Sequence, residues 1–320
     1  MRTIALEEHF WTPELAAAPG TGPLAMWGQR ADDLLRDLGA GRLADMDANG
    51  IDVQVISHVS PAAQGRPGAD GIALARAAND ALAAAVRAHP DRFAGFATLP
   101  TADPGAAADE LSRACGELGL VGGLVGSTLG SNDAFLDDQR FSVLLARFES
   151  LDVPLYLHPA PPGEALRSAL YDGLPPAVAG RLATGAWGWH AEAGLHVLRL
   201  IATGVLDRYP RLRLIVGHCG EMLPFLLARI DTMLPLPSLS LSSVSEYMLR
   251  NVWVTTSGLF SLPPVMCTVQ VMGVERVMFS VDYPFGSNAA GRALLDSLPL
   301  APDDLAKIAG GNAARVLGLA

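Results

Sequence analysis

Acidic and imidazole side chains open the chain, in the run Leu6-Glu7-Glu8-His9-Phe10. Side chains alternate between the two faces of a β-strand, so Glu7 and His9 point to one side and Glu8 to the other. A carboxylate and an imidazole on the same side can converge on one metal ion. The alternative is a solvated strand end with a capped turn, because Glu-x-His is too short a motif to decide alone.

A histidine or an aspartate also lies at the C-terminal end of several other predicted strands. The residues at strand ends are His9, His58, His158, His218 and Asp282. A histidine buried at the end of an apolar strand needs a partner, which is either a backbone carbonyl or a metal ion. Four histidines at equivalent places, together with a carboxylate, favour a metal. Imidazole and carboxylate ligands with room for water suit zinc or manganese at a catalytic site.

The other three histidines are predicted to be structural or exposed. His89 precedes Pro90 at a helix end, and His190 and His196 lie in a helical stretch. Isolated histidines of this kind are more often satisfied within the fold than engaged in chemistry.

Converging strand ends require a particular scaffold, and the 320 residues predict one. The predicted strands are Thr3–Leu6, Val53–Ser57, Phe93–Leu99, Val121–Val125, Leu155–His158, Leu212–His218, Val252–Thr256 and Val277–Asp282. The predicted helices are Ile72–Ala88, Pro104–Leu118, Phe141–Leu151, Ala191–Leu206, Glu221–Met233, Leu262–Met272 and Asp303–Leu317. This alternation predicts an α/β fold, a closed (β/α)8 TIM barrel that forms a single domain over residues 1–320. A doubly wound open sheet is the alternative.

Two segments interrupt the alternation. Trp11 to about Asp45 follows the first strand, and its prolines and glycines predict a loop insertion with one short helix. His158 to about Trp189 follows the fifth strand and is also rich in proline and glycine. Barrel enzymes build their active sites at the C-terminal ends of strands, so these loop insertions after strands 1 and 5 are predicted walls of a substrate pocket.

Composition excludes several partners. The net charge is −10 and no run of Lys or Arg occurs, so nucleic acid and anionic membrane are poor partners. Asn251 to Val274 carries no charge, but Pro263 and Pro264 interrupt it, and it is predicted as a strand, a loop and a helix rather than a membrane span. Three scattered cysteines and the absence of a signal peptide predict a cytoplasmic protein. No nucleotide-binding glycine motif follows the first strand, so no organic cofactor is expected.

Five motifs, at Ala5–Phe10, Val153–Pro159, Gly217–Phe225, Thr255–Gly258 and Phe279–Phe285, carry a family resemblance over nearly the whole chain. The chain resembles the amidohydrolase superfamily, in particular the branch with γ-resorcylate, 5-carboxyvanillate and aminocarboxymuconate-semialdehyde decarboxylases. The resemblance implies one divalent metal ion ligated by Glu7, His9, His158 and Asp282. Glutamate two residues before His9 is similar to the hydroxybenzoate decarboxylases rather than to the semialdehyde enzyme.

For the residues around the ion, the resemblance implies roles of different kinds. His218 would lie beside the ion as an acid, a base or a hydrogen-bond donor to substrate. Glu221, three residues further on, could orient that histidine, as outer carboxylates commonly do. Arg229 matches a position that faces substrate in the relatives, and its alternative is a surface salt bridge with Asp231 or a neighbour.

The substrate-facing residues keep their alternatives. His58 replaces the Asn or other small polar residue of the relatives, so it could change substrate choice or simply fill a gap. The aromatic residues that could contact a substrate ring, or could be plain core, are Trp11, Trp187, Trp189, Tyr283 and Phe285. The two insertions match the relatives weakly, so the substrate itself is not carried over.

The resemblance implies an enzyme, a carboxy-lyase that removes CO2 without oxidation from a small hydroxylated aromatic acid of the 2-hydroxybenzoate kind. Asp282 would carry a proton to the ring, and the metal would act as Lewis acid and template. The alternative on the same barrel is hydrolysis of a lactone, ester or amide, with Asp282 as general base. A third possibility is a metal-binding structural or regulatory barrel without activity. By analogy, a homodimer or homotetramer is expected.

Overall fold

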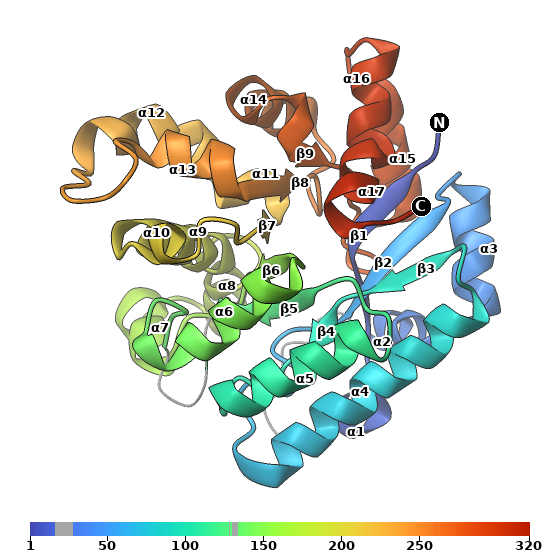
Figure 1. Cartoon of the computed structure of the whole chain (residues 1–320). Helices are drawn as coiled ribbons and strands as arrows, with labels where there is room; N and C mark the ends of the chain where they lie inside the picture. The colour runs from blue at the N-terminus through green and yellow to red at the C-terminus, as the bar shows by residue number, and fades with distance from the viewer. Residues whose placement is uncertain (17–27, 128, 130–133) are drawn as a thin grey trace.

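The computed structural model describes residues 1–16, 28–127, 129 and 134–320. Its strands are β1 (Ile4–Phe10), β2 (Val53–His58), β3 (Phe93–Gly95), β4 (Ala97–Thr98), β5 (Gly123–Gly126), β6 (Leu155–His158), β7 (Leu214–Val216), β8 (Val252–Thr255) and β9 (Val277–Met278). Its α-helices are α1 (Pro13–Ala16), α2 (Gly28–Arg36), α3 (Ala40–Ala48), α4 (Gly68–Ala88), α5 (Pro104–Gly116), α6 (Ser142–Leu151), α7 (Glu164–Tyr171), α8 (Pro176–Ala183), α9 (Gly188–Ala202), α10 (Val205–Arg208), α11 (His218–Glu221), α12 (Leu223–Met233), α13 (Val244–Asn251), α14 (Leu262–Met272), α15 (Asn288–Ser297), α16 (Pro302–Ala306) and α17 (Asn312–Leu317). The helices surround the strands, and both chain ends lie near α17 (Figure 1).

The strands form a closed barrel in which the named strand pairs are all parallel. β3 and β4 are two halves of one barrel strand, since Phe96 between them donates its backbone N–H to Ile56 O at 2.9 Å. The last barrel strand returns to the first where Leu6 pairs with Ser280 and donates its N–H to Phe279 O at 3.2 Å. The predicted (β/α)8 barrel is confirmed, and this closure rules out the open sheet.

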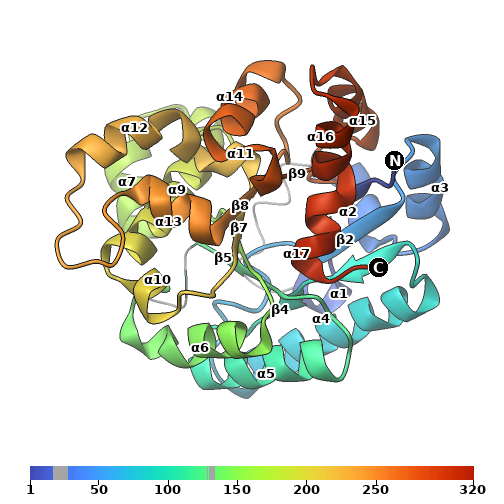
Figure 2. The ribbon, with the colours of Figure 1, turned by 45° about the horizontal axis from the view of Figure 1, so that its top comes forward.

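Alternate residues of the strands pack into two cores, as strands buried on both faces require. Leu6 lies in the cluster that fills the barrel interior, whereas its neighbour Ala5 packs outward with the helices. α17 adds Val316 and Leu317 to the interior cluster and so covers one end of the barrel (Figure 2). Each such side chain, fully buried, stabilises the fold by about 2 kcal/mol. The C-terminal ends of the strands are left for chemistry.

The insertion after β1 holds more helix than the sequence predicts. The described residues there form α1, α2 and α3, whereas one short helix was expected. The start of α3 was hidden because Gly39 occupies its N-cap position and offers no capping side chain. Asp37 takes over part of this role by accepting from the backbone N–H groups of Gly39 and Arg42, each at 2.8 Å. The proline and glycine cluster at residues 19–23 lies outside the described residues.

The insertion after β6 also folds into helices, α7 and α8, before α9 begins. The uncharged stretch from Asn251 to Val274 is β8, a loop and α14, as predicted. In the part of the chain that the structure describes, no helix is both long and apolar enough to cross a membrane.

Candidate metal centre

The end of β1, the end of β6 and the segment after β9 bring four side chains together. His158 Nε2 lies 3.3 Å from Glu7 Oε1, and His9 Nε2 lies 3.2 Å from Asp282 Oδ1. Glu7, His9 and His158 each place a ligand-type atom within 4.8 Å of the others. The structure therefore gathers the four residues that the sequence predicts as metal ligands.

Hydrogen bonds within the chain do not satisfy this group. His158 Nδ1 lies 2.6 Å from Pro159 O, which can only accept, so Nδ1 carries the proton and Nε2 turns its lone pair toward Glu7. Burial lowers the pKa of His158 to about 3, so its ring is neutral. Glu7 Oε1 and His9 Nε2 are buried without a hydrogen-bond partner among the described residues. Lone pairs that face one another favour a cation between them, and this donor set fits one divalent metal ion.

The second carboxylate oxygen of Glu7, Oε2, is held by hydroxyl groups of other barrel strands. Tyr156 donates its hydroxyl proton to Glu7 Oε2, and Thr255 Oγ1 lies 3.4 Å from the same oxygen. A Cβ on Gly217 would lie only 2.6 Å from Oε2, so glycine there leaves room for the carboxylate. Burial raises the pKa of Glu7, and burial beside that charge raises the pKa of Tyr156 well above its usual value. Because Oε2 is engaged, Oε1 is the oxygen free to face a cation.

The backbone that carries the predicted ligands is strained. Glu7 has a φ of 61° and Asp282 a φ of 69°. Left-handed backbone at a non-glycine residue costs about 1 kcal/mol. The register between β1 and β2 also shifts between Ala5 and Glu8, which marks a β-bulge that the alternation rule did not predict. Strain of this kind persists where the surrounding structure enforces it, often at functional sites.

Glu8 points away from the predicted ligands, as expected, and closes the barrel. Its two carboxylate oxygens accept from the backbone N–H of Val281 at 2.9 Å and of Tyr283 at 3.0 Å. These amides lie on either side of Asp282. Burial raises the pKa of Glu8 to about 8. A residue between two predicted ligands of β1 thus fixes the segment that carries the last one.

A left-handed turn presents His218 and Glu221. All five residues from His218 to Met222 have positive φ, between 47° and 80°. The turn brings His218 Nδ1 to 2.7 Å from Glu221 Oε1. The family resemblance suggested that Glu221 could orient His218. The predicted strand ran as far as His218, whereas β7 ends at Val216.

His218 lies among carboxylates. Its Nε2 is 3.7 Å from Asp282 Oδ2, and its Nδ1 is 3.8 Å from Glu7 Oε1. Burial alone would lower the pKa of His218, but the charges of Glu7 and Glu221 raise it well above its usual value. Burial opposes ionisation of Glu221, yet His218 and His190 lower its pKa to about 2. The geometry therefore favours a protonated imidazole next to Asp282.

His190 is a residue of this site that sequence reasoning missed. Its Nδ1 lies 2.5 Å from Glu221 Oε2, and its ring centroid is 4.8 Å from that of His218. His190, predicted to be structural or exposed, is thus partly exposed and bonded to Glu221. No periodic pattern could have found it, because Glu221 lies 31 positions further along the chain. His196, by contrast, is buried and bonded to Ser127 O at 2.9 Å, which suits a structural role.

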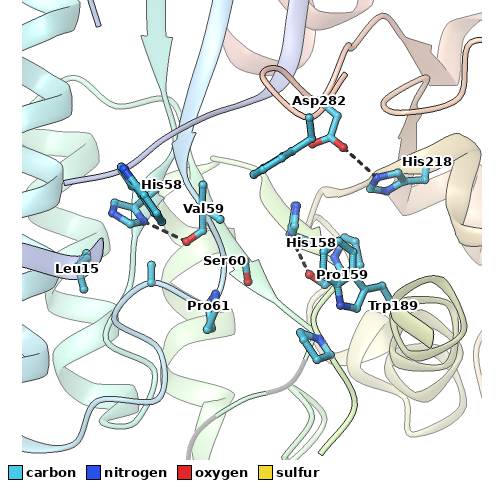
Figure 3. Close-up of a pocket in the computed structure, with 14 residues that line it drawn as sticks. Leu15, His58, Val59, Ser60, Pro61, His158, Pro159, Trp189, His218 and Asp282 are labelled. Carbon is cyan, nitrogen blue, oxygen red and sulfur yellow. Dashed lines mark hydrogen bonds and ion pairs between the residues drawn. The ribbon is translucent and has the colours of Figure 1, made fainter. Parts of the chain in front are cut away.

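A pocket opens beside these groups, and most of the other residues that line it are apolar (Figure 3). His158, His218 and Asp282 form its polar side. Residues of both predicted insertions contribute to the walls, and the aromatic residues that line the pocket are Trp11, Trp189 and Phe285. Of the other aromatic candidates, Trp187 is 53% exposed, and Tyr283 packs against Arg42 with the guanidinium carbon 4.8 Å from its ring centroid. An aromatic ring is well suited to such walls.

His58 also lines the pocket, but both of its ring nitrogens are engaged inside the protein. Nδ1 lies 3.0 Å from Val59 O, and Nε2 accepts from the backbone N–H of Thr12 at 3.2 Å. Burial lowers the pKa of His58 to about 4, so the ring is neutral. His58 therefore forms part of the wall and holds the start of the first insertion in place.

Arg229 lies exposed on α12, and it is not among the pocket-lining residues in the described part of the chain. Asp231, its alternative partner, accepts from the backbone N–H of Ser245 at 3.0 Å. The predicted contact between Arg229 and substrate stays a prediction.

A parallel (β/α)8 barrel with carboxylates and imidazoles facing one another at its strand ends defines a metal-dependent barrel enzyme. Residues 7–319 match the Amidohydrolase family, and the chain belongs to that family.

Three similar proteins narrow the class. Decarboxylase orsB of Emericella nidulans is 42% identical over 298 residues, which cover 90% of this chain and 87% of the relative. Gamma-resorcylate decarboxylase of Rhodococcus jostii is 38% identical over 330 residues, covering 99% of this chain and 98% of the relative. A crystal structure of dihydroxybenzoic acid decarboxylase from Polaromonas sp. contains manganese and the inhibitor 2-nitroresorcinol; it has a TM-score of 0.91 and 34% identity and covers 99% of this chain and 97% of that chain. The predicted class, a metal-dependent carboxy-lyase for an aromatic acid, is confirmed, and the hydrolase and inactive-barrel alternatives have no counterpart among these three.

Proposed function

We propose that the chain, as a single domain, holds one divalent metal ion on Glu7, His9, His158 and Asp282 and decarboxylates a 2-hydroxybenzoate-like acid beside it. The observation that carries the proposal is a pair of buried atoms, Glu7 Oε1 and His9 Nε2, that find no hydrogen-bond partner among the residues the structure describes and lie next to a pocket with aromatic walls. The ion, when bound, would supply Lewis acidity and a template for a carboxylate with an adjacent phenolic oxygen.

Asp282 is the residue proposed to move the proton. Its side chain is 16% exposed and lines the pocket, so it can face a bound ring. Burial would raise the pKa of Asp282, but the contact with His218 holds it below its usual value. The ionised carboxylate therefore needs a donor before it can deliver a proton. His218, with Nε2 at 3.7 Å, is positioned to supply it.

The proposed reaction uses one proton in each turnover. The proton passes from Asp282 to the ring carbon that bears the carboxylate. The bond between this carbon and the carboxylate then breaks, its electron pair restores the aromatic ring, and CO2 leaves. The apolar walls keep water away from the ring while charge develops. A substrate anion and a proton give a phenol and CO2, so no organic cofactor is required.

Turnover in D2O tests this reaction. The manganese-loaded protein is assayed for CO2 release against a panel of hydroxybenzoates, and the product is analysed for deuterium. We expect one deuteron at the carbon that lost CO2, and carboxylation ortho to the hydroxyl when a phenol is supplied with high bicarbonate. Inert hydroxybenzoates together with cleavage of simple lactones or amides would overturn the proposal in favour of a hydrolase.

For the metal we propose manganese, with zinc as the alternative. The manganese in the Polaromonas relative supports this choice, and a set of two imidazoles and two carboxylates suits either ion. Elemental analysis of the active protein distinguishes them. An active form without metal would contradict the ligand assignment.

We further propose a cytoplasmic homodimer or homotetramer. Phe225 and Met233 on α12 are 80% and 59% exposed, and apolar residues gathered on one helix favour an interface. Arg229 lies on the same helix, so its predicted contact with substrate would have to be made in a neighbouring subunit. The three cysteines are free, which suits a reducing compartment. Light scattering measures the molecular mass of the oligomer. Phe225→Lys places a charge in the proposed interface and is expected to lower this mass by weakening association.

A further inference from the structure

His190 reaches the buried carboxylate of Glu221 from the solvent side. It lies in the first turn of α9 and its side chain is 18% exposed, whereas that of Glu221 is fully buried. His190 Nδ1 is 2.5 Å from Glu221 Oε2, and His190 Nε2 is 3.0 Å from Gly185 O. The other oxygen of Glu221 receives His218 Nδ1 at 2.7 Å. One carboxylate therefore holds two imidazoles, one on each oxygen.

The hydrogen-bond partners in this group indicate which atoms donate and which accept. Glu221 is ionised and Gly185 O is a carbonyl, so both can only accept. Nδ1 of His190 therefore donates to Glu221, and its Nε2 lies within hydrogen-bond distance of Gly185 O. These three side chains could hold a metal by residue type and spacing, but both oxygens of Glu221 and both nitrogens of His190 already have partners. The group is an array of hydrogen bonds that orients His218, and it leaves no opening for a second ion.

The second insertion sets the position of His190. A Cβ on Gly188 would lie 2.5 Å from Ala183 O at the end of α8, so the start of α9 fits closely against this helix. The next two residues face different partners: Trp189 lines the pocket and His190 meets Glu221. His190 does not itself line the pocket in the described part of the chain.

We infer that His190 is a positioning residue for the reaction. By holding one oxygen of Glu221 it keeps the other on His218, whose Nε2 then faces Asp282. Without the Nδ1 donor, a buried carboxylate oxygen loses its partner and Glu221 is free to rotate away from His218. The pocket walls and the predicted metal ligands are untouched by this loss. The inference rests on the proposed decarboxylase function, and it predicts an effect on kcat rather than on KM or metal content.

Three substitutions at one position test the inference. His190→Phe keeps a ring but removes both ring nitrogens, and we expect kcat to fall about tenfold while KM and bound manganese stay at parent values. His190→Asn retains an N–H donor near the place of Nδ1 and is expected to recover most of kcat. If the larger side chain of His190→Phe prevents folding, His190→Ala is used in its place. The His190 side chain is partly exposed, so water can fill the space that alanine leaves. The same substitutions at His89, a histidine at the end of α4, serve as matched controls and leave kcat unchanged.

A double variant separates positioning from a structural role. In a Glu221→Gln background, His190→Phe should add no further loss, because His190 acts through the carboxylate that is already changed. Additive losses would overturn the inference, and so would parent kcat in both His190→Phe and His190→Ala, or a loss that His190→Asn does not recover. A parent protein that decarboxylates no hydroxybenzoate would instead overturn the proposed function.

Discussion

Two groups of histidine and carboxylate side chains lie next to each other at one end of the barrel. The first consists of Glu7, His9, His158 and Asp282, and the second of His190, His218 and Glu221. The ring centroids of His158 and His218 are 6.5 Å apart. In the first group, Glu7 Oε1 and His9 Nε2 are buried and have no hydrogen-bond partner within the described part of the chain. In the second, bonds of 2.5 and 2.7 Å join Glu221 to its two histidines. Residue types are the same in both, so unpaired lone pairs, rather than a cluster of ligand-type residues, mark the place for a cation.

The largest expected effect breaks the first group. His158→Ala or Asp282→Asn should remove bound metal and lower kcat by more than about 100-fold, beyond the loss typical of an outer contact. Elemental analysis and CO2 release measure both quantities. His89→Ala is the control and should resemble the parent. A variant of either ligand that keeps full metal content and activity would show that the ion lies elsewhere.

A smaller effect, loss of turnover without loss of metal, is expected for His218 of the second group. His218→Asn should retain the metal, because His218 is bonded to Glu221 and is not among the four predicted ligands, and should lower kcat by about 100- to 10,000-fold as a lost proton donor does. The same two assays decide this prediction. Loss of metal in this variant would place His218 among the ligands.

Glu221→Gln should have a milder effect, with kcat about tenfold lower and an altered pH profile. The charge of Glu221 raises the pKa of His218, so its removal lowers that pKa. If activity needs protonated His218, the loss of kcat at alkaline pH should therefore begin at a lower pH in the variant than in the parent. Profiles of kcat between pH 5 and 10 test the direction, and an unmoved alkaline limb would contradict it.

The smallest effect concerns a histidine outside both groups. Burial lowers the pKa of His196 from 6.5 to about 4, and its ring is held by Ser127 O and by the N–H of Leu136 at 2.8 Å. Between these pH values the unfolded chain binds more protons. Stability is therefore full above pH 6.5 and falls toward pH 4, by about 1 kcal/mol per pH unit.

Urea unfolding at pH 7.5 and 5.5 measures this slope. His196→Asn removes the titrating ring, so the variant should be less stable at pH 7.5 but lose less on acidification than the parent. Equal pH dependence in the two proteins would assign the acid sensitivity to other buried groups, such as His58, whose pKa burial also lowers to about 4.

The predicted ligands could be read from the sequence because a parallel barrel brings the ends of its strands to one face, whatever lies between them. That rule selected His158 and Asp282 together with His58 and His218, and the family resemblance then separated the predicted ligands from the other two. Glu7 needed more: the alternation rule gave its partner His9, but the β-bulge at φ 61° was not visible in the letters Glu-Glu-His. Side chains that meet at strand ends are therefore predictable, and the backbone detail that aims them is not.

Residues supplied by the insertions were harder to predict. His190 sits in an ordinary helical pattern, and only the packing of α8 against Gly188 turns it toward Glu221. His58 stood out by its type, yet its hydrogen bond to the backbone of Thr12 fixes its role, and that bond depends on how the first insertion folds back. Both cases involve contacts between segments without a shared periodicity, which a single sequence does not encode locally.

The two hydrogen bonds that Glu8 accepts on either side of Asp282 have a consequence for biosynthesis. Glu7 and Asp282 are separated by 275 positions, so the first predicted ligand leaves the ribosome early and the last one near the end of translation. A nascent chain has no complete ligand set until the barrel has closed on Val281 and Tyr283. A centre built on these four predicted ligands can therefore be completed only after residue 282 has been synthesised, and a chain truncated before it would lack Asp282.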